Sequence, residues 1–370
     1  MNDHSARPGT TAEPSGRHRV WQSSGELKEH WYVACTAAEL RRKRIFAATI
    51  LGLGIAVFRK SDGTARALLD QCVHRGTALS AGRLIDSCLV CPYHGWRYDE
   101  NGRVVHIPTE DGAALPGKPH AYSQRAFAAR EAFGLIWVYP GDRDPEAAPV
   151  FDMPYWKSPG WVNYYMVSRF DGDVNGLAQN FMDVPHTVYV HNKIFRTSPA
   201  KLMRSTVEFK PASVEVEYHE SADTIGMMPW LTNPQRAPLE HTDKFFAPNI
   251  TRCDYHWGST SGFVITSQIT PVDGRSCRVY TLISYKFPLP VWLSKTLRPL
   301  IHGYTRAVLE QDIRIMRINR RGLDNSPAPE MKNVKADLVH VGIERLIDAY
   351  RHGTPVIEKH LGKRPVEFNL

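Results

Sequence analysis

The sequence predicts an α+β protein with two domains. We expect an N-terminal antiparallel β domain, followed by a larger α+β domain in which helices flank a central antiparallel sheet. Three observations support this. The chain has 370 residues, which is longer than a single hydrophobic core usually supports. Short β-rich runs separated by turn signals fill residues 31–141. Longer helical patterns appear only beyond them.

The composition is that of an ordinary globular protein, with 42% hydrophobic and 23% charged residues. Residues 1–24 are polar and read as a flexible leader, with no secretory apolar run. No apolar run reaches the roughly 18 residues that a membrane span requires. We therefore expect a cytoplasmic protein that has no membrane span.

The first domain is assigned to residues 25–145. Residues 49–58, 67–70 and 135–139 resemble strands. Asp62-Gly63 and Asn101-Gly102 predict tight hairpin turns, because these residues tolerate a positive φ. The boundary near residue 145 lies in a junction rich in proline and aspartate.

The second domain is assigned to residues 146–370. We expect a helix over 173–182, a multi-stranded sheet over 207–283, a helix over 304–321 and a last helix over 337–351, followed by a basic tail. Gly52-x-Gly54 lacks the third glycine and the helix of a dinucleotide-binding loop. The chain is therefore not expected to bind a nicotinamide cofactor directly.

The net charge of +8 reflects basic clusters at residues 41–44 and 314–321. Such clusters steer acidic partners, either an electron carrier or nucleic acid. The preferred explanation is that they are solvated helix faces on an ordinary basic protein. We expect no nucleic-acid partner.

The most specific motif pairs one cysteine with one histidine, twice. Sixteen residues separate Cys72-Val73-His74 from Cys91-Pro92-Tyr93-His94. A Rieske [2Fe-2S] cluster requires this donor set, because two thiolates hold one iron and two imidazoles hold the other. Gly76, Gly82 and Gly95 suit loops that bend tightly, and Trp96 and Tyr98 could pack beside the cluster.

Zinc is the competing interpretation of this motif. Zinc pairs usually place two to four residues between cysteines, whereas here one residue separates Cys72 from His74. The six cysteines are better explained as core thiols and metal ligands than as a disulfide framework.

A second metal site is predicted around residues 180–191. His186 and His191 are five apart, so their side chains converge only if the helix breaks, and Pro185 supplies a reason for a break. Two histidines and one carboxylate form the facial triad that holds Fe(II) in non-heme oxygenases. Asp183, three residues before His186, is placed to orient that imidazole.

The carboxylate of this triad must come from elsewhere, and Asp312 is the candidate. It lies at the centre of an apolar stripe in the predicted helix 304–321, formed by Val308, Leu309, Ile315 and Met316. A carboxylate that faces a core is unfavourable unless it is paired or binds metal. A buried ion pair is the alternative role. Glu310 is the second choice of ligand, but it points toward the arginine face.

Residues 72–108, which read CVHRGTALSAG and then CPYHGWRYDENGRVVHIP, resemble the Rieske domain of ring-hydroxylating oxygenases. The layout of nearly the whole chain also resembles these Rieske non-heme iron oxygenases. It consists of a Rieske domain, a helix with two histidines, a sheet and a late helix with an aspartate. The resemblance implies a [2Fe-2S] cluster, a mononuclear Fe(II), and electrons from NAD(P)H through a separate flavin reductase or ferredoxin.

The resemblance also implies roles for two further residues. Asp183 matches an aspartate that links the catalytic iron to the cluster of a neighbouring subunit, so a homotrimer is expected. Asn180 matches an asparagine near the iron.

The expected reaction uses O2 to hydroxylate or oxidatively demethylate an apolar substrate, either aromatic or polycyclic and sterol-like. The apolar character of the substrate is suggested by aromatic and methionine side chains, namely Met227, Met228, Trp230, Phe245 and Phe246. Residues 287–301 would either pack on the surface or touch a membrane. The alternatives are a desaturase, an oxidative cyclase, an electron-transfer Rieske protein without catalysis, and a zinc-stabilised interaction protein.

Overall fold

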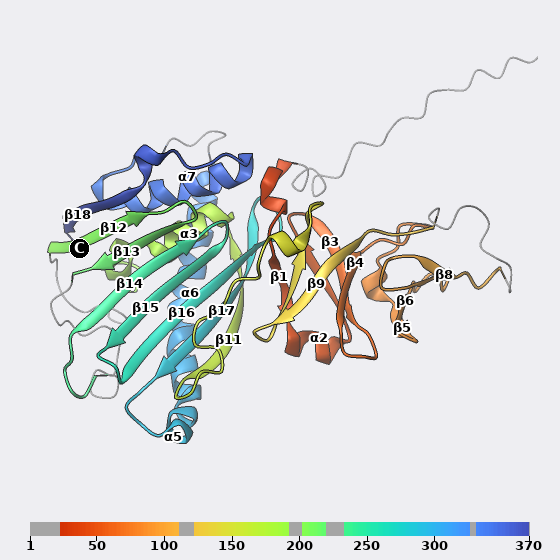
Figure 1. Ribbon diagram of the computed structural model, residues 1–370, viewed down its shortest axis with the longest axis horizontal. Helices are drawn as coiled ribbons and strands as arrows, with labels where there is room; N and C mark the ends of the chain where they lie inside the picture. The colour runs from red at the N-terminus through yellow and green to blue at the C-terminus, as the bar shows by residue number, and fades with distance from the viewer. Residues whose placement is uncertain (1–22, 111–121, 192–201, 220–232, 326–330, 370) are drawn as a thin grey trace, which may run out of the picture.

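The computed structural model describes residues 23–110, 122–191, 202–219, 233–325 and 331–369. Nearly all of the predicted leader lies outside these ranges. Figure 1 shows two lobes side by side, with the N-terminal half of the chain in one and the C-terminal half in the other. This agrees with the predicted α+β fold. Within the described residues, no helix is both long and apolar enough to cross a membrane.

The N-terminal lobe consists of a six-stranded sheet in the order β1-β10-β9-β4-β3-β2 and a four-stranded sheet in the order β5-β6-β7-β8. All pairs are antiparallel, as predicted. The strands are β1 Tyr32–Thr36, β2 Ile45–Ile50, β3 Leu53–Arg59, β4 Ala65–Leu69, β5 Arg83–Ile85, β6 Cys88–Val90, β7 Arg97–Tyr98, β8 Val104–His106, β9 Ala126–Ala132 and β10 Leu135–Tyr139. The short helices are η1 Gly25–Lys28, α2 Ala37–Lys43, η2 Leu79–Ala81 and η3 Pro145–Ala147.

Both predicted hairpin turns are present, with φ of 88° at Gly63 and 79° at Gly102. The single strand expected over residues 49–58 is wrong. Leu51 and Gly52 both adopt a positive φ and form a tight turn that joins β2 to β3. A continuous apolar run therefore concealed a hairpin, because both of its strands are largely buried.

The C-terminal lobe is built on an eight-stranded antiparallel sheet in the order β11-β17-β16-β15-β14-β13-β12-β18. The strands are β11 Val162–Asp171, β12 Leu202–Phe209, β13 Ser213–Tyr218, β14 Leu239–Phe246, β15 Ile250–Trp257, β16 Ser261–Pro271, β17 Ser276–Lys286 and β18 Gly362–Asn369. The helices are α3 Val174–Met182, η4 Pro185–Val188, α5 Val291–Thr296, α6 Arg298–Leu323, η5 Lys335–Asp337, α7 Leu338–His352 and η6 Glu358–His360.

Two elements of this lobe differ from the prediction. The helix expected from residue 304 begins at Arg298, because Pro299 fits the first turn, where a missing N–H is harmless. The expected basic tail instead forms β18, which pairs with β12 over eight residues. Residues 287–301 include the short helix α5 and the start of α6, with Trp292 exposed.

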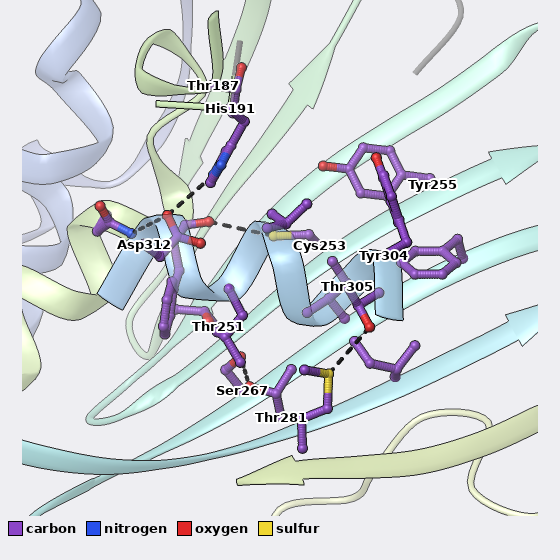
Figure 2. Close-up of a pocket in the computed structure, with 18 of the residues that line it drawn as sticks. Thr187, His191, Thr251, Cys253, Tyr255, Ser267, Thr281, Tyr304, Thr305 and Asp312 are labelled. Carbon is purple, nitrogen blue, oxygen red and sulfur yellow. Dashed lines mark hydrogen bonds and ion pairs between the residues drawn. The ribbon is translucent and has the colours of Figure 1, made fainter. Parts of the chain in front are cut away.

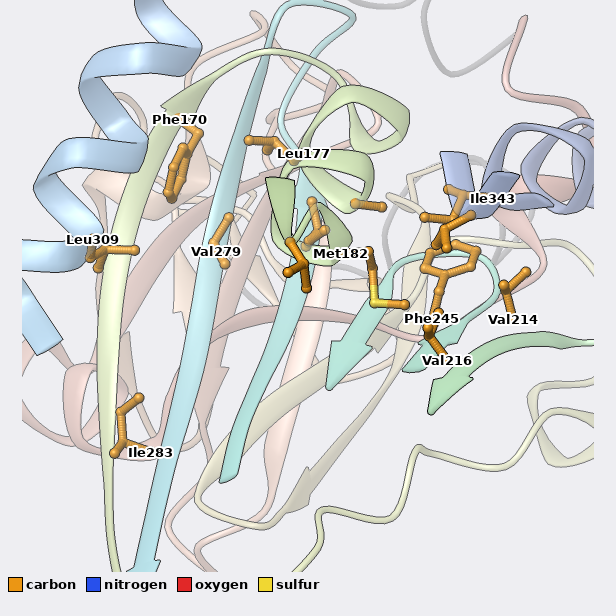
Figure 3. Close-up of a cluster of buried hydrophobic side chains, with 14 of the residues drawn as sticks. Phe170, Leu177, Met182, Val214, Val216, Phe245, Val279, Ile283, Leu309 and Ile343 are labelled. Atoms are coloured by element: carbon orange, nitrogen blue, oxygen red, sulfur yellow. The ribbon is translucent and has the colours of Figure 1, made fainter. Parts of the chain in front are cut away.

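The two faces of the large sheet serve different purposes. One face packs against α3, α6 and α7, and Figure 3 shows this core, with Leu177 and Met182 between the helix and the strands. The opposite face contacts the N-terminal lobe. There Thr270 donates to the carbonyl of Val33 at 2.8 Å, and Tyr280 donates to that of Ala34 at 2.5 Å. Alternate residues of β16 and β17 therefore face the helices or the other lobe.

Candidate metal centres and the adjoining pocket

The first centre is formed by two loops with the same backbone geometry. In each loop a cysteine carbonyl accepts from the amide of a glycine four residues later, Gly76 to Cys72 at 2.8 Å and Gly95 to Cys91 at 3.1 Å. These glycines have φ of 75° and 73°, which favour residues without a side chain. The two turns bring one thiol and one imidazole each to the same tip of the lobe.

The side chains at this tip suit a cluster. The His74 and His94 rings lie 4.6 Å apart between centroids, and Trp96 stacks on His74 at 4.7 Å. The Tyr98 hydroxyl accepts from the amide of Val73 and lies 3.1 Å from the Cys72 sulfur. None of the six cysteines forms a disulfide. His74 Nδ1 is buried and has no hydrogen-bond partner among the residues that the structure describes, as expected for a metal ligand.

The second centre begins where α3 ends. Asp173 caps the start of α3 by accepting from the amide of Gly176 at 2.8 Å. The helix ends at Met182, Asp183 is extended, and Pro185 opens the short helix η4. This break is the one that the sequence predicts, and it changes the direction of the chain between Asn180 and His186.

Asp312 comes from α6, where the buried residues follow a regular helical spacing: Ile301, Thr305, Leu309, Asp312 and Met316. The exposed face carries Arg314, Arg317 and Arg321. Glu310, the second choice of ligand, is exposed and pairs with Arg306. Of the two carboxylates, only Asp312 therefore points toward the histidines.

The three candidate ligands meet in space. One donor atom each of His186, His191 and Asp312 lies within 4.8 Å of the other two. The Asp312 carboxylate is 3.4 Å from His186 Nε2 and 3.2 Å from His191 Nε2. Burial alone raises the pKa of Asp312, but hydrogen bonds from the two histidines outweigh it and hold the pKa below its usual value.

The outer nitrogens of both imidazoles face hydrogen-bond acceptors. His186 Nδ1 lies against the backbone carbonyl of Asp183, and His191 Nδ1 lies 2.9 Å from Oε1 of Gln311. A bound metal would fix the tautomer in which both Nδ1 atoms carry the protons, so that the two Nε2 atoms, 3.1 Å apart, would serve as ligands beside the Asp312 carboxylate. The donor set therefore fits a divalent metal such as Fe(II).

Asn180 and Asp183 lie beside this set, and Gln311 is a contact that sequence reasoning missed. Asn180 Nδ2 donates to Asp312 Oδ1 at 3.2 Å. The Asp183 carboxylate is 3.9 Å from His186 Nδ1, and burial raises its pKa. Gln311 could have been suspected only as the neighbour of Asp312 on the same helix.

A cavity of about 120 Å³ adjoins the three ligands, between α6 and the strands β15, β16 and β17. Figure 2 shows Asp312 and His191 at one end and Tyr255 and Tyr304 at the other. Its apolar walls include Met166, Phe181, Phe263, Ile265, Ile283 and Leu309. Its polar groups include Thr251, Cys253, Tyr255, Ser267, Thr281 and Tyr304.

Two of the aromatic residues that suggested an apolar substrate, Phe245 and Phe246, lie away from this cavity. Phe245 is fully buried in the helix-facing core, near Ile343 in Figure 3, and Phe246 packs against Phe151. Neither lines the cavity. Met227, Met228 and Trp230 lie outside the described residues.

Two family models match this chain. Residues 30–119 match the model of the Rieske [2Fe-2S] domain, and residues 170–351 match that of the vanillate O-demethylase oxygenase C-terminal domain. The chain belongs to the Rieske oxygenases. This family carries the [2Fe-2S] cluster together with a mononuclear iron. The family expected from the motifs is confirmed.

Several Rieske oxygenases resemble this one. The oxygenase component of dicamba O-demethylase from Stenotrophomonas maltophilia is 38% identical over 168 residues, 45% of this chain and 48% of the relative. A vanillate O-demethylase oxygenase subunit from a Pseudomonas strain is 29% identical over 57% of this chain and 55% of its own. The matches thus span about half the length of these relatives. A crystal structure of dicamba monooxygenase has the same fold, with a TM-score of 0.75 and 23% identity over 88% of this chain and 97% of that one.

Proposed function

We propose that this Rieske oxygenase hydroxylates or oxidatively O-demethylates a small aromatic substrate. One observation carries the proposal: the two histidines and the aspartate converge at the end of a mainly apolar pocket. An electron-transfer protein has no need of a pocket beside a second metal site. The relatives named as O-demethylases support the choice of reaction.

Cys72, His74, Cys91 and His94 would hold the cluster, and His186, His191 and Asp312 would hold the iron. When bound, these two groups supply one-electron chemistry and the activation of dioxygen at open iron positions. The protein contributes the rest. Gln311 and the Asp183 carbonyl orient the imidazoles, Asn180 holds the carboxylate, and the apolar walls exclude water from the reacting carbon.

Demethylation of an aryl methyl ether balances as follows. One oxygen atom of O2 enters the methyl C–H bond, and the resulting hemiacetal separates into a phenol and formaldehyde. The other oxygen atom leaves as water. Two electrons and two protons are required, and NAD(P)H would supply the electrons through a separate flavin reductase or ferredoxin. We further propose a homotrimer in which Asp183 links the iron of one subunit to the cluster of the next.

The test combines metal content with turnover. The purified protein should contain about three iron atoms and two labile sulfides per chain. With a reductase and NAD(P)H, it should consume O2 and release formaldehyde from aryl methyl ethers, or add one oxygen atom to aryl C–H substrates. About two iron atoms and no substrate-dependent O2 uptake would instead indicate an electron carrier, and zinc would indicate an interaction module.

A further inference from the structure

The pocket beside the iron ligands has neutral walls. Apart from the ligands themselves, none of its described lining residues is charged, and no lysine or arginine is among them. Burial raises the pKa of the Tyr304 phenol to about 12. Burial, reinforced by the nearby Asp243, raises the pKa of the Cys253 thiol well above its ordinary value. Both groups are therefore uncharged at neutral pH.

One polar feature of these walls points to a ligand. Ser267 on β16 and Thr281 on β17 are direct cross-strand partners, and their hydroxyl oxygens lie 3.1 Å apart. Both residues are only 4% exposed. Two hydroxyls carry two protons, and the bond between them uses one. Within the described part of the chain the pair makes no other side-chain hydrogen bond, so one buried donor remains for an acceptor in the pocket.

The volume of the cavity indicates the size of the ligand that would carry this acceptor oxygen. An apolar protein cavity of about 150 Å³ is known to bind benzene. The volume here, about 120 Å³, is of the same order. A single ring with small substituents is the appropriate scale, whereas the polycyclic skeleton considered from the sequence is much larger.

An ionised substituent would be unfavourable in this environment. A buried carboxylate loses its hydration and needs a cationic or multiple hydrogen-bonding partner in its place, and none of the described lining residues is a lysine or an arginine. The Asp312 carboxylate adds like charge at one end of the pocket. At the Ser267–Thr281 pair, one spare hydroxyl donor suits a neutral acceptor oxygen, whereas a carboxylate there would need several donors.

We propose that the pocket takes an uncharged substrate of single-ring size, bound through a neutral acceptor oxygen at the Ser267–Thr281 pair, and discriminates against the corresponding carboxylate. This inference rests on the proposed oxygenase function, because it names the substrate class of the same site. It separates this protein from any relative whose substrate is an aromatic acid.

Binding and turnover are tested separately with matched probes. Vanillyl alcohol and vanillate share a ring and a methoxy group and differ in charge, as do 3-methoxybenzyl alcohol and 3-methoxybenzoate. Equilibrium dialysis of the holoenzyme without an electron donor should show that each alcohol binds roughly tenfold more tightly, or better, than the matching carboxylate. Formaldehyde release should follow the same order.

Acids that bind as tightly as their alcohols, or alcohols that do not bind, would overturn the inference. Selective binding of the alcohols without any oxygenated product would leave the inference standing and would contradict the proposed oxygenase function. The two hypotheses therefore fail in different ways.

Variants without these hydroxyls locate the acceptor oxygen. The double variant Ser267→Ala/Thr281→Val removes both hydroxyls of the pair, because either single variant would leave one hydroxyl donor free. It should lower the affinity for 3-methoxybenzyl alcohol about five- to tenfold. The affinity for 3-methoxytoluene, which lacks the second oxygen, should not change. The matched control is Thr266→Val, whose buried hydroxyl has no partner among the described residues and whose side chain does not line the cavity. An equal loss of affinity for both ligands, or the same loss in the control variant, would show that the acceptor oxygen does not bind at the Ser267–Thr281 pair.

Discussion

Oε1 of Gln311 lies 2.9 Å from Nδ1 of His191, at the opposite edge of the imidazole from the nitrogen that faces Asp312. The amide oxygen accepts only, so it selects the tautomer in which Nδ1 carries the proton and Nε2 remains free for a metal. Because Gln311 and Asp312 are adjacent on α6, one helix supplies both a ligand and the group that orients another ligand. We infer that Gln311 is a positioning residue.

Gln311→Ala should lower the affinity for the mononuclear iron about 10- to 100-fold, the usual effect of losing a group that orients a metal ligand. Gln311→Glu, which keeps an acceptor oxygen, should retain most of the affinity. The measurement is Fe(II) titration of apoprotein, followed by iron analysis. Glu310→Ala changes the preceding, exposed residue and should have no effect. Equal iron affinity in Gln311→Ala and wild type would rule out the positioning role.

His186→Ala should abolish turnover and leave the visible spectrum of the Rieske cluster intact, because the two centres lie on different lobes. Iron content should fall from about three to about two atoms per chain. Full activity in this variant would contradict the assignment of the iron site. A changed cluster spectrum would indicate misfolding, so circular dichroism should accompany the assay.

Asp183→Asn should keep both metal centres but slow electron transfer between them, since it removes the proposed carboxylate link while retaining size. The experiment mixes chemically reduced protein with substrate and O2 and follows oxidation of the cluster by its absorbance. Asp348→Asn, an exposed substitution on α7, is the matched control. Wild-type oxidation rates in Asp183→Asn would show that electrons take another route.

Glu29 should stabilise the fold in a pH-dependent manner. It accepts hydrogen bonds from the Tyr139 hydroxyl at 2.7 Å and from the amides of Asp142 and Arg143. Burial by itself raises the pKa of Glu29, but these hydrogen bonds outweigh it and lower the pKa below the ordinary value of 4.5. The stabilisation is therefore present above pH 4.5 and is lost as the pH falls through the lower pKa of the folded state.

Glu29→Gln should accordingly lower the free energy of unfolding by about 1–3 kcal/mol at pH 7. The difference from wild type should shrink as the pH falls below 4.5. Urea unfolding at a series of pH values measures both effects, and the exposed substitution Glu344→Gln serves as the control. A difference that does not change with pH would mean that the charge of Glu29 contributes nothing.

Much of this protein could be predicted from local sequence patterns. The hairpin turns at Gly63 and Gly102 followed from residue types that tolerate a positive φ. The break after Met182 followed from Pro185, and the inward direction of Asp312 followed from the apolar stripe on its helix. Each of these features depends on neighbours within a few residues, so the sequence carries the information directly.

The tertiary structure decided which of these residues share a site. Asp312 lies 121 positions beyond His191 in the sequence, yet its carboxylate is 3.2 Å from that imidazole. The contact of Gln311 with His191 and the pairing of Ser267 with Thr281 arise only when the helix and the strands come together. Phe245 and Phe246 illustrate the same limit. Alternation along a strand predicts that neighbours face opposite ways, but only packing decides which part of each face borders the pocket and which part is covered by helices or by the other lobe.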